Sequence, residues 1–506
     1  MSNIRLRYSG FIVFLSRFLS LFTGLAFTIL ITRQLTIEEF GIWQIISAAV
    51  AVSLAPSYIV NFWLTRFEAR NQGAAVTGAV MNLGMLSIGT TIFFLIILPM
   101  VQHLSSPLPI FLIAGIQVPL YYFVNNFEAV SFGVKPQVQG YAFLIFELFK
   151  LPSAYILVVV LHYSLVGAIL AVASAQVVQM IILGIMLRGR YHSSFNLNYA
   201  KRWLKSFWLP LFGGGSFGTG IWFLFVVDSF VISALTSSSE AVGIYRLAFT
   251  LTDIVVYTSV LSVALYPKLL AGGTKKDVEQ ALSYMLMLAI PLAFGLFMLA
   301  NPFLRIMKPD YVVAIGTLRT LVFPAFALAM SRVVDIIITG YEKVDLIKRP
   351  TFKDYLRSGL FIVPRINLIN ALVYLGSLSI IITIFLRFQI DSPTITLIWA
   401  AVLLATKIPF VIYKLVIAKR LTHFKTPIST IVKYLIASTI MCIPLFFAEK
   451  YLNTQNVFLP LLLLTLSAVI LGAITYFAIL YLLDNEFKHM VHTIIRKYNP
   501  FLSKDT

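Results

Sequence analysis

LTIEEFGIWQI at residues 35–45 is echoed two hundred residues later by LTSSSEAVGIYRL at residues 235–247. Each stretch follows a long apolar run and has an aromatic residue two positions after a glycine and a glutamate three positions before it. A second pair, FGVKP at 132–136 and TGYEK at 339–343, repeats at almost the same distance: the glycine-to-glycine offsets are 202 and 207. Two pairs of similar stretches, separated by nearly the same number of residues, indicate that the chain contains a duplication.

The segments around these echoes are strongly apolar. Of the 506 residues, 59% are hydrophobic and only 12% are charged, whereas a soluble domain has about 25% charged residues. Apolar runs of about 20 residues are long enough to cross a bilayer as helices. The sequence therefore predicts an all-α polytopic membrane protein with about fourteen transmembrane helices. The expected spans are roughly 8–32, 42–64, 75–101, 108–131, 139–161, 164–187, 207–235, 243–266, 280–300, 312–338, 366–386, 394–416, 428–448 and 456–483.

The first apolar run is too long for a cleavable signal peptide and has no small-residue cleavage site, so we expect it to remain as a span. With the N-terminus inside, 28 of the 39 lysines and arginines fall on cytoplasmic loops and tails and 5 on outer loops. Basic loops stay on the cytoplasmic side. This distribution predicts a multi-pass protein of the plasma membrane with both termini in the cytoplasm. It also explains the net charge of +19 without a nucleic-acid partner.

The duplication predicts how the spans are grouped. Each echo of the first pair follows the first span of a six-span block, and an even number of spans makes the two blocks parallel repeats. Transporters with such repeats carry their substrate between the halves. The expected parts are an N-terminal lobe (1–187), a basic cytoplasmic linker (188–206), a C-terminal lobe (207–420), a final span pair (421–485) and a cytoplasmic tail (486–506).

This six-plus-six-plus-two plan resembles a known family. With ITRQLTIEEFGIWQ after span 1, ALYPKLLAGGTKKDVEQAL after span 8 and PLAFGLFMLANPFLRIMKPDYV around span 9, the chain is similar to Wzx-like polysaccharide flippases of the multidrug/oligosaccharidyl-lipid/polysaccharide (MOP) exporter superfamily. The resemblance covers roughly residues 1–420 and extends to the final span pair. It implies two six-helix lobes in a V around a central cavity.

The resemblance also implies a function. Flippases of this kind move lipid-linked oligosaccharides, carried on a polyprenyl or dolichyl (pyro)phosphate, from the cytoplasmic to the outer leaflet. The products serve cell-surface polysaccharide or glycoprotein glycan assembly. The expected partners are this substrate, membrane lipids and glycan-assembly proteins, and we expect a monomer. Coupling to H⁺ or Na⁺ is possible in such a transporter, and we expect no other cofactor.

Ionisable residues within the spans are the candidate functional residues, because a charge at mid-bilayer costs about 2.5–3.5 kcal/mol and is usually buried in the protein or in a wet cavity. We expect Glu147 to pair with Lys150 and Arg332 with Asp335, since each pair has helical spacing. Lys407 is expected to extend its amine to the cytoplasmic boundary. The ionisable residues at span positions are Arg17, Lys150, Arg246, Arg319, Arg332, Lys407, Glu128, Glu147, Asp228, Asp253 and Asp335.

Arg17 is the deepest charge in the first span. It lies on a stripe of small and polar residues that includes Ser20, Gly24 and Thr28, and no acid lies within four residues of it. A guanidinium can bind a phosphate through two parallel hydrogen bonds. Arg17 and Ser20 are therefore candidate substrate-binding residues, and pairing of Arg17 with an acid on a neighbouring span is the alternative.

In the second half, Asp228 and Arg246 flank the repeated turn at similar depth, which predicts a structural ion pair between the two spans. Asp253 lies two turns below Arg246, and a carboxylate there could bind a coupling H⁺ or Na⁺; Asp228 is the other candidate for this role. Arg319 in span 10 is a further candidate for the substrate cavity. The sequence predicts no metal site and no catalytic residue.

Span 7 is expected to be bent or loosely packed by Pro210 and by a glycine-rich stretch, GGGSFGTG at 213–220. The stretch resembles a phosphate-binding loop, but no strand precedes it and no lysine closes it. A hinge between the halves and close helix packing remain alternative roles. The glycines concerned are Gly213, Gly214, Gly215, Gly218 and Gly220.

Two other functions compete with flipping of a lipid-linked glycan. An ion-coupled multidrug or cation exporter of the same superfamily would have twelve spans and a cavity dominated by acids. A membrane glycosyltransferase or glycan polymerase would need a sizeable outer loop with catalytic carboxylates, and the outer loops here are short. The sequence therefore favours the flippase and disfavours an enzyme.

Overall fold

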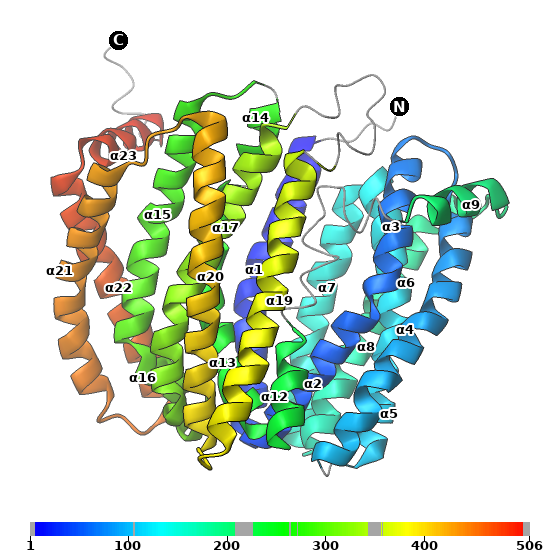
Figure 1. The fold of residues 1–506 in the computed structure, drawn as a ribbon, viewed down its shortest axis with the longest axis horizontal. Coiled ribbons are helices and arrows are strands. Elements are labelled where there is room, and N and C mark those ends of the chain that lie inside the picture. The colour runs from blue at the N-terminus through cyan, green and yellow to red at the C-terminus, as the bar shows by residue number, and fades with distance from the viewer. Residues whose placement is uncertain are drawn as a thin grey trace. The chain divides into compact units, whose positions relative to one another are not determined.

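The computed structural model describes residues 6–104, 107–207, 226–262, 265–270, 272–342, 356 and 358–498, and all regular structure in these ranges is helical (Figure 1). Contacts divide the chain into two compact units. The first contains Met1–Arg246 and Pro364–Thr396, and the second contains Leu247–Val363 and Leu397–Thr506.

Most helices of the first unit come from the N-terminal part of the chain. Helix α1 packs along α7, and α7 packs along α8. The helices are α1 (Leu6–Gln34), α2 (Ile37–Ser53), α3 (Ala55–Ala69), α4 (Ala75–Leu104), α5 (Leu108–Gly115), α6 (Gln117–Val134), α7 (Pro136–Ala154), the π-helical η1 (Tyr155–Val160), α8 (Ser164–Leu187), η2 (Arg188–Arg190), α9 (Leu197–Lys205) and α12 (Asp228–Thr236).

The second unit consists of the later helices, although the beginnings of α13 and α20 and most of α19, from Pro364 to Leu386, belong to the first unit. Within it, α15 packs against α17 and α21, and α21 against α22. The helices are α13 (Glu240–Val256), η4 (Tyr257–Ser262), α14 (Leu265–Leu270), α15 (Lys275–Met298), α16 (Ala300–Met307), η5 (Pro309–Ala314), α17 (Ile315–Gly340), α19 (Gly359–Leu386), α20 (Ser392–Thr422), α21 (Ile428–Leu452), α22 (Phe458–Leu483) and α23 (Asn485–Tyr498).

The described residues contain 11 helices long and apolar enough to span a membrane, or 12 if the bent pair α2 and α3 is one span. These correspond to twelve of the fourteen expected spans. Of the other two, the first coincides with α1, and the seventh is described only in part, as α12. The all-α membrane architecture is confirmed, and the number fourteen stays a prediction.

The bend in the second expected span has a local cause. Helices α2 and α3 meet at 48° around Leu54, and Pro56 occupies the first turn of α3. Proline has no N–H to donate and its ring clashes with the carbonyl four residues earlier, so a helix cannot run straight through it.

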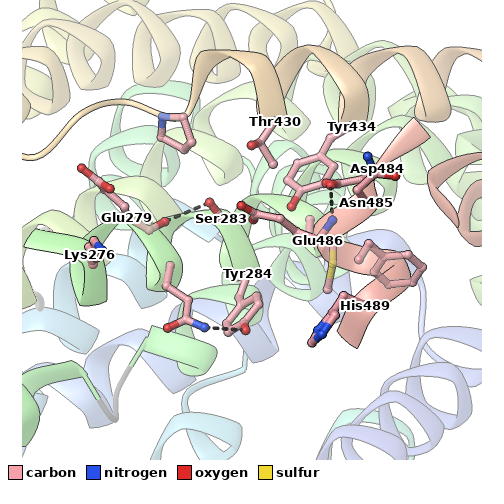
Figure 2. A pocket seen from close by; sticks show the side chains of 14 residues that line it. Lys276, Glu279, Ser283, Tyr284, Thr430, Tyr434, Asp484, Asn485, Glu486 and His489 are labelled. Carbon is pink, nitrogen blue, oxygen red and sulfur yellow. Dashed lines mark hydrogen bonds between the residues drawn. The ribbon is translucent and has the colours of Figure 1, made fainter. Parts of the chain in front are cut away.

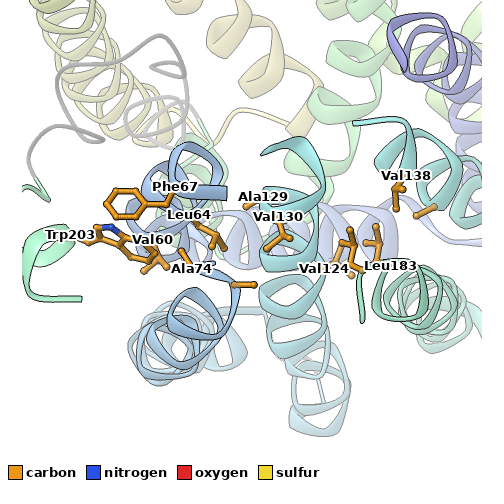
Figure 3. Packing of buried hydrophobic residues seen from close by; sticks show 13 residues of the cluster. Val60, Leu64, Phe67, Ala74, Val124, Ala129, Val130, Val138, Leu183 and Trp203 are labelled. Carbon is orange, nitrogen blue, oxygen red and sulfur yellow. The ribbon is translucent and has the colours of Figure 1, made fainter. Parts of the chain in front are cut away.

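The predicted basic linker contains a helix that is anchored to the first unit. Helix α9 presents Trp203, which is fully buried, to the ends of neighbouring helices (Figure 3). Its ring lies edge-on to Phe67 with centroids 5.3 Å apart. The same apolar cluster includes Leu64, Val130 and Leu183, so α9 closes one end of a core built from α3, α6 and α8.

The two echoes of the repeated turn face each other in the first unit. A Cβ added at Gly41 would overlap the Ser239 carbonyl, 2.7 Å from its carbon, and a Cβ added at Gly243 would overlap the Ile37 carbonyl oxygen. Ile37 and Ser239 are related by the same offset as the two glycines. Each turn thus packs its glycine against the other's backbone, as expected for parallel repeats around a two-fold axis.

The helices that begin at these two turns are capped in a similar way, each by a hydroxyl side chain. The Thr36 hydroxyl accepts from the backbone N–H of Glu39 at 3.1 Å, and the Ser238 hydroxyl, 202 residues later, accepts from the N–H of Glu240 at 3.1 Å. A serine hydroxyl at the start of another helix then donates to each glutamate: Ser164 to Glu39 and Ser392 to Glu240, both at 2.6 Å. The duplication read from the sequence therefore has a structural counterpart.

Candidate functional site

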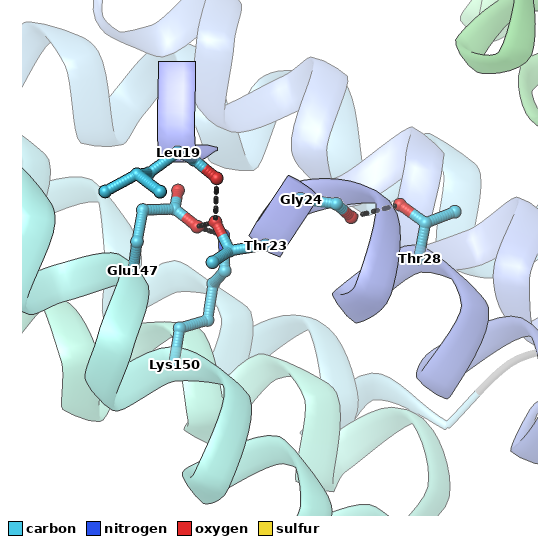
Figure 4. A network of polar contacts seen from close by, with 6 residues as sticks. All are labelled: Leu19, Thr23, Gly24, Thr28, Glu147 and Lys150. Atoms are coloured by element: carbon cyan, nitrogen blue, oxygen red, sulfur yellow. Dashed lines mark hydrogen bonds and ion pairs between the residues drawn. The ribbon is translucent and has the colours of Figure 1, made fainter. Parts of the chain in front are cut away.

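Arg17 lies on α1, the helix that packs along α7, and its side chain is outside the described residues. The contact between α1 and α7 includes a polar network: Thr23 Oγ1 donates to Glu147 Oε2 at 2.6 Å (Figure 4). Lys150 Nζ lies 2.8 Å from the same carboxylate oxygen, so the expected pair within α7 is present. This network lies six residues, about 9 Å of helix rise, from Arg17.

The polar stripe expected on α1 is divided between two environments. Ser20 is half-buried, whereas a Cβ added at Gly24 would meet no atom within 4 Å. Thr28 donates to the Gly24 carbonyl at 2.9 Å, so its hydroxyl is satisfied within the helix. Glu147 is an acid on a neighbouring span, as the alternative role of Arg17 requires. Both roles of Arg17, and that of Ser20, stay predictions.

Asp228 and Arg246 form an ion pair in the first unit. Arg246 Nε also donates to Ser229 Oγ at 2.7 Å, and the Tyr374 hydroxyl donates to the second Asp228 oxygen at 2.7 Å. The Asp228 side chain is only 4% exposed. Since both of its oxygens are occupied, it could bind a coupling ion only if these contacts rearranged.

The other two predicted positions lie in the second unit. Asp253 is half-buried on α13, and its coupling role stays a prediction. Arg319 lies near the beginning of α17, where its Nη2 is 3.5 Å from Glu449 Oε1 and its Nε donates to the Phe297 carbonyl at 3.2 Å. These contacts offer Arg319 a structural role beside the predicted substrate role. The predicted hinge, Pro210 and the glycines at 213–220, lies outside the described residues.

A second polar cluster in the first unit surrounds Glu128. Its carboxylate accepts hydrogen bonds from two side-chain amides, those of Gln139 and Gln179, each at 3.1 Å. Gln176, one turn before Gln179 on α8, is fully buried, and its amide has no hydrogen-bond partner among the described residues. Hydropathy alone gave no indication that these amides gather around one carboxylate.

The most notable charges in the second unit were assigned wrongly from the sequence. Lys414, which is absent from the predicted span charges, is 1% exposed, and its Nζ lies 2.7 Å from Asp335 Oδ1 and 2.9 Å from Ser331 Oγ. Asp335 therefore pairs with Lys414, although helical spacing suggested Arg332. The reason is that Lys414 of α20 packs against α17, where Ser331 and Asp335 both accept hydrogen bonds from its amine.

Lys407 does not extend its amine to a membrane boundary. It lies fifteen residues from either end of α20, about 22 Å of helix rise, and is 6% exposed. It interacts electrostatically with Lys414, Asp335 and Arg332. Three cations and one carboxylate are thus gathered within two spans. Lys407 and Lys414 are seven residues apart, on the face of α20 that also buries Ala400, and this spacing is the signal that could have identified them.

Comparisons with known proteins support the fold. No family model matches the chain, and no curated protein matches it in sequence. Among solved structures, the lipid II flippase MurJ in an inward closed conformation matches with a TM-score of 0.59 at 15% identity, covering 95% of this chain and 99% of that one.

Two conformations of a multidrug resistance MATE family transporter of the MOP superfamily also match. The inward-facing form has a TM-score of 0.57 at 12% identity, covering 79% of this chain and 95% of that one. The outward-facing form has a TM-score of 0.50 at 15% identity, covering 82% and 95%. The chain is therefore an integral membrane protein with the fold of MOP-superfamily transporters and flippases.

Proposed function

We propose that the chain is a flippase that moves a lipid-linked oligosaccharide from the cytoplasmic to the outer leaflet by alternating access. The observation that carries this proposal is the extent of the structural match. The structural match to the lipid II flippase covers 95% of this chain, whereas the matches to the MATE transporter cover about four fifths of it. A substrate with a long lipid tail gives a reason for helices beyond a twelve-span transporter.

The charges in the second unit support an anionic substrate. Lys407 and Lys414 are buried, Arg332 lies nearby, and among the described residues Asp335 interacts with both lysines. Buried charges of one sign are costly unless opposite charge compensates them. A (pyro)phosphate would supply that compensation, and amine and guanidinium groups are its usual ligands. Arg17 and Ser20 of the first unit keep their proposed role as ligands of a (pyro)phosphate.

The paired turns around Gly41 and Gly243 suggest how access alternates. They lie at the end of the spans that the charge distribution predicts to face outward, where they close the two repeats against each other. In the proposed cycle the headgroup enters from the cytoplasm while this contact is closed. Rocking of the repeats, lobes 1–187 and 207–420, then opens the contact and releases the headgroup outside.

An ion-coupled multidrug exporter is the second candidate, since the inward-facing MATE transporter matches with a TM-score of 0.57. Such an exporter would bind lipophilic cations, which acids stabilise and the cluster around Lys407 would repel. The two functions can therefore be distinguished by the charge of the ligand that the purified protein binds.

The test compares two probes, a polyprenyl-diphosphate disaccharide and ethidium. The full chain in detergent is expected to bind the disaccharide lipid and not ethidium. Lys407→Gln should weaken binding of the lipid about tenfold, equivalent to about 1.4 kcal/mol. Lys419→Gln, on the exposed end of the same helix, is the control and should have no effect. Binding of ethidium without binding of the disaccharide lipid would favour the exporter.

A further inference from the structure

The second unit contains a pocket of about 1010 Å³ (Figure 2). It lies where α15 and α21 begin and α22 is followed by α23, at the end of the spans that the charge distribution predicts to be cytoplasmic. Neither the duplication nor the proposed flipping cycle accounts for it. Its walls are formed by Lys276, Glu279, Gln280, Ser283, Tyr284, Met287, Pro427, Thr430, Tyr434, Asp484, Asn485, Glu486, Phe487 and His489.

Three carboxylates line the pocket, and they differ in how many hydrogen bonds they accept from the protein. Asp484 is buried, and its Oδ1 accepts from Lys433 Nζ at 3.4 Å and from the backbone N–H of Glu486 at 3.0 Å. Glu279 accepts from the backbone N–H of Lys425 at 2.7 Å through one of its two oxygens. The carboxylate of Glu486 forms no hydrogen bond or ion pair with any other described residue. The pocket thus has carboxylate oxygens available to a hydrogen-bond donor.

Tyr434 contributes a further polar group to the pocket. The residue is only 4% exposed and lines the pocket, and its ring lies beside Glu486 (Figure 2). Among the described residues its hydroxyl has no hydrogen-bond partner. The hydroxyl itself is accessible from the pocket, where it can donate to or accept from a ligand. A polar ligand in the pocket would satisfy it together with the carboxylates.

The surroundings of the pocket indicate that a lipid can reach it. Ile428 and Leu482, at the ends of α21 and α22 beside the pocket, are 67% and 76% exposed, as expected for side chains that contact acyl chains. The sequence of α23, NEFKHMVHTIIRKY, is basic and amphipathic, which is typical of a helix in the headgroup region. Phe487 of α23 stacks on Phe477 of α22 with centroids 5.8 Å apart, holding α23 against the span.

We propose that this pocket binds the headgroup of an aminophospholipid from the cytoplasmic leaflet. The primary ammonium donates to the free carboxylate oxygens of Glu486 and Glu279 and to the Tyr434 hydroxyl oxygen, while Lys276 attracts the phosphate. A choline headgroup has no N–H to donate, and the carboxylates repel a headgroup with net negative charge. The site does not depend on which substrate the chain flips.

The test uses native mass spectrometry of the full chain with phosphatidylethanolamine, phosphatidylcholine or phosphatidylglycerol carrying identical acyl chains. The wild type is expected to retain phosphatidylethanolamine about tenfold better than the other two. Glu486→Gln and Tyr434→Phe should each remove most of this preference. Glu38→Gln and Tyr413→Phe, which alter an exposed glutamate and an exposed tyrosine outside the pocket, are the matched controls and should keep it.

Equal retention of the three lipids by the wild type would overturn the proposal. So would an undiminished preference in Glu486→Gln, which alters an exposed side chain and should fold normally. Loss of the preference in the two control variants would show that it does not arise at this pocket.

Discussion

Replacing Gly41 with alanine is expected to separate the two repeated turns at the predicted outer end. The added Cβ would lie 2.7 Å from the carbonyl carbon of Ser239, whereas ordinary contacts begin at about 3.4 Å. The neighbouring atoms belong to the backbone, which cannot rotate away as a side chain would. The carbonyl oxygen of Ser239 lies closer still, so one turn must move away from the other. Gly243→Ala should have the same effect, because its Cβ would overlap the Ile37 carbonyl.

The size of the effect follows from the cost of overpacking, about 1–3 kcal/mol. Gly41 lies inside α2, where alanine is the better helix former by about 1 kcal/mol, so the helix itself should not be weakened. The overpacking therefore destabilises the closed form, in which the two turns are in contact. The equilibrium between closed and open forms should shift roughly 5- to 150-fold towards open.

Labelling of a buried cysteine measures this shift. Cys442 is the chain's one cysteine, so Cys442→Ser provides a background for Ala241→Cys, at a fully buried position next to the contact. A membrane-impermeant maleimide added outside should react with it faster in Gly41→Ala. Gly84→Ala is the matched control, since its Cβ would meet nothing within 4 Å. Equal labelling rates in the Gly41, Gly243 and Gly84 variants would refute the idea that the repeats close against each other here.

Three further predictions concern single contacts and topology. Lys414→Ala should lower the free energy of unfolding by about 1–3 kcal/mol, because it leaves the half-buried Asp335 without its ion-pair partner, and the double variant with Asp335→Ala should recover part of the loss in thermal unfolding. Tyr374→Phe should cost about 1 kcal/mol, because the hydrogen bond to Asp228 is lost while its ion pair remains; a loss as large as that of Asp228→Ala would contradict this. With Cys442 replaced, a cysteine added near either terminus should react with an impermeant reagent only after the cells are permeabilised. Labelling of such a cysteine in intact cells would show that the predicted orientation is wrong.

The helices could be predicted from the sequence because apolar runs and their lengths report directly on the membrane. Helix boundaries were less predictable where the helix leaves the apolar region: α20 continues to Thr422, beyond the expected end of the span at 416. Hydropathy treats a lysine near such a boundary as solvated. Whether it is buried depends on a second helix, here α17 with Asp335, and no local pattern contains that information.

The repeated turn was the most informative local signal. Its two copies reveal the duplication, and the structure adds that Gly41 and Gly243 are required by mutual close approach rather than by an unusual backbone conformation. The pair of Asp228 and Arg246 was predictable because both lie near one such turn. The roles of Tyr374 and Ser229 in that pair were not, since Tyr374 is far away in the sequence and neither residue is ionised.

Flipping itself tests the central claim most directly. The full chain is reconstituted into liposomes that contain a fluorescent polyprenyl-diphosphate disaccharide, and the fraction of probe reduced by external dithionite is followed with time. The account predicts that the protein makes probe from the inner leaflet accessible and that Arg17→Ala, present at the same level, abolishes this. A rate no higher than in protein-free liposomes, together with extrusion of ethidium, would contradict it.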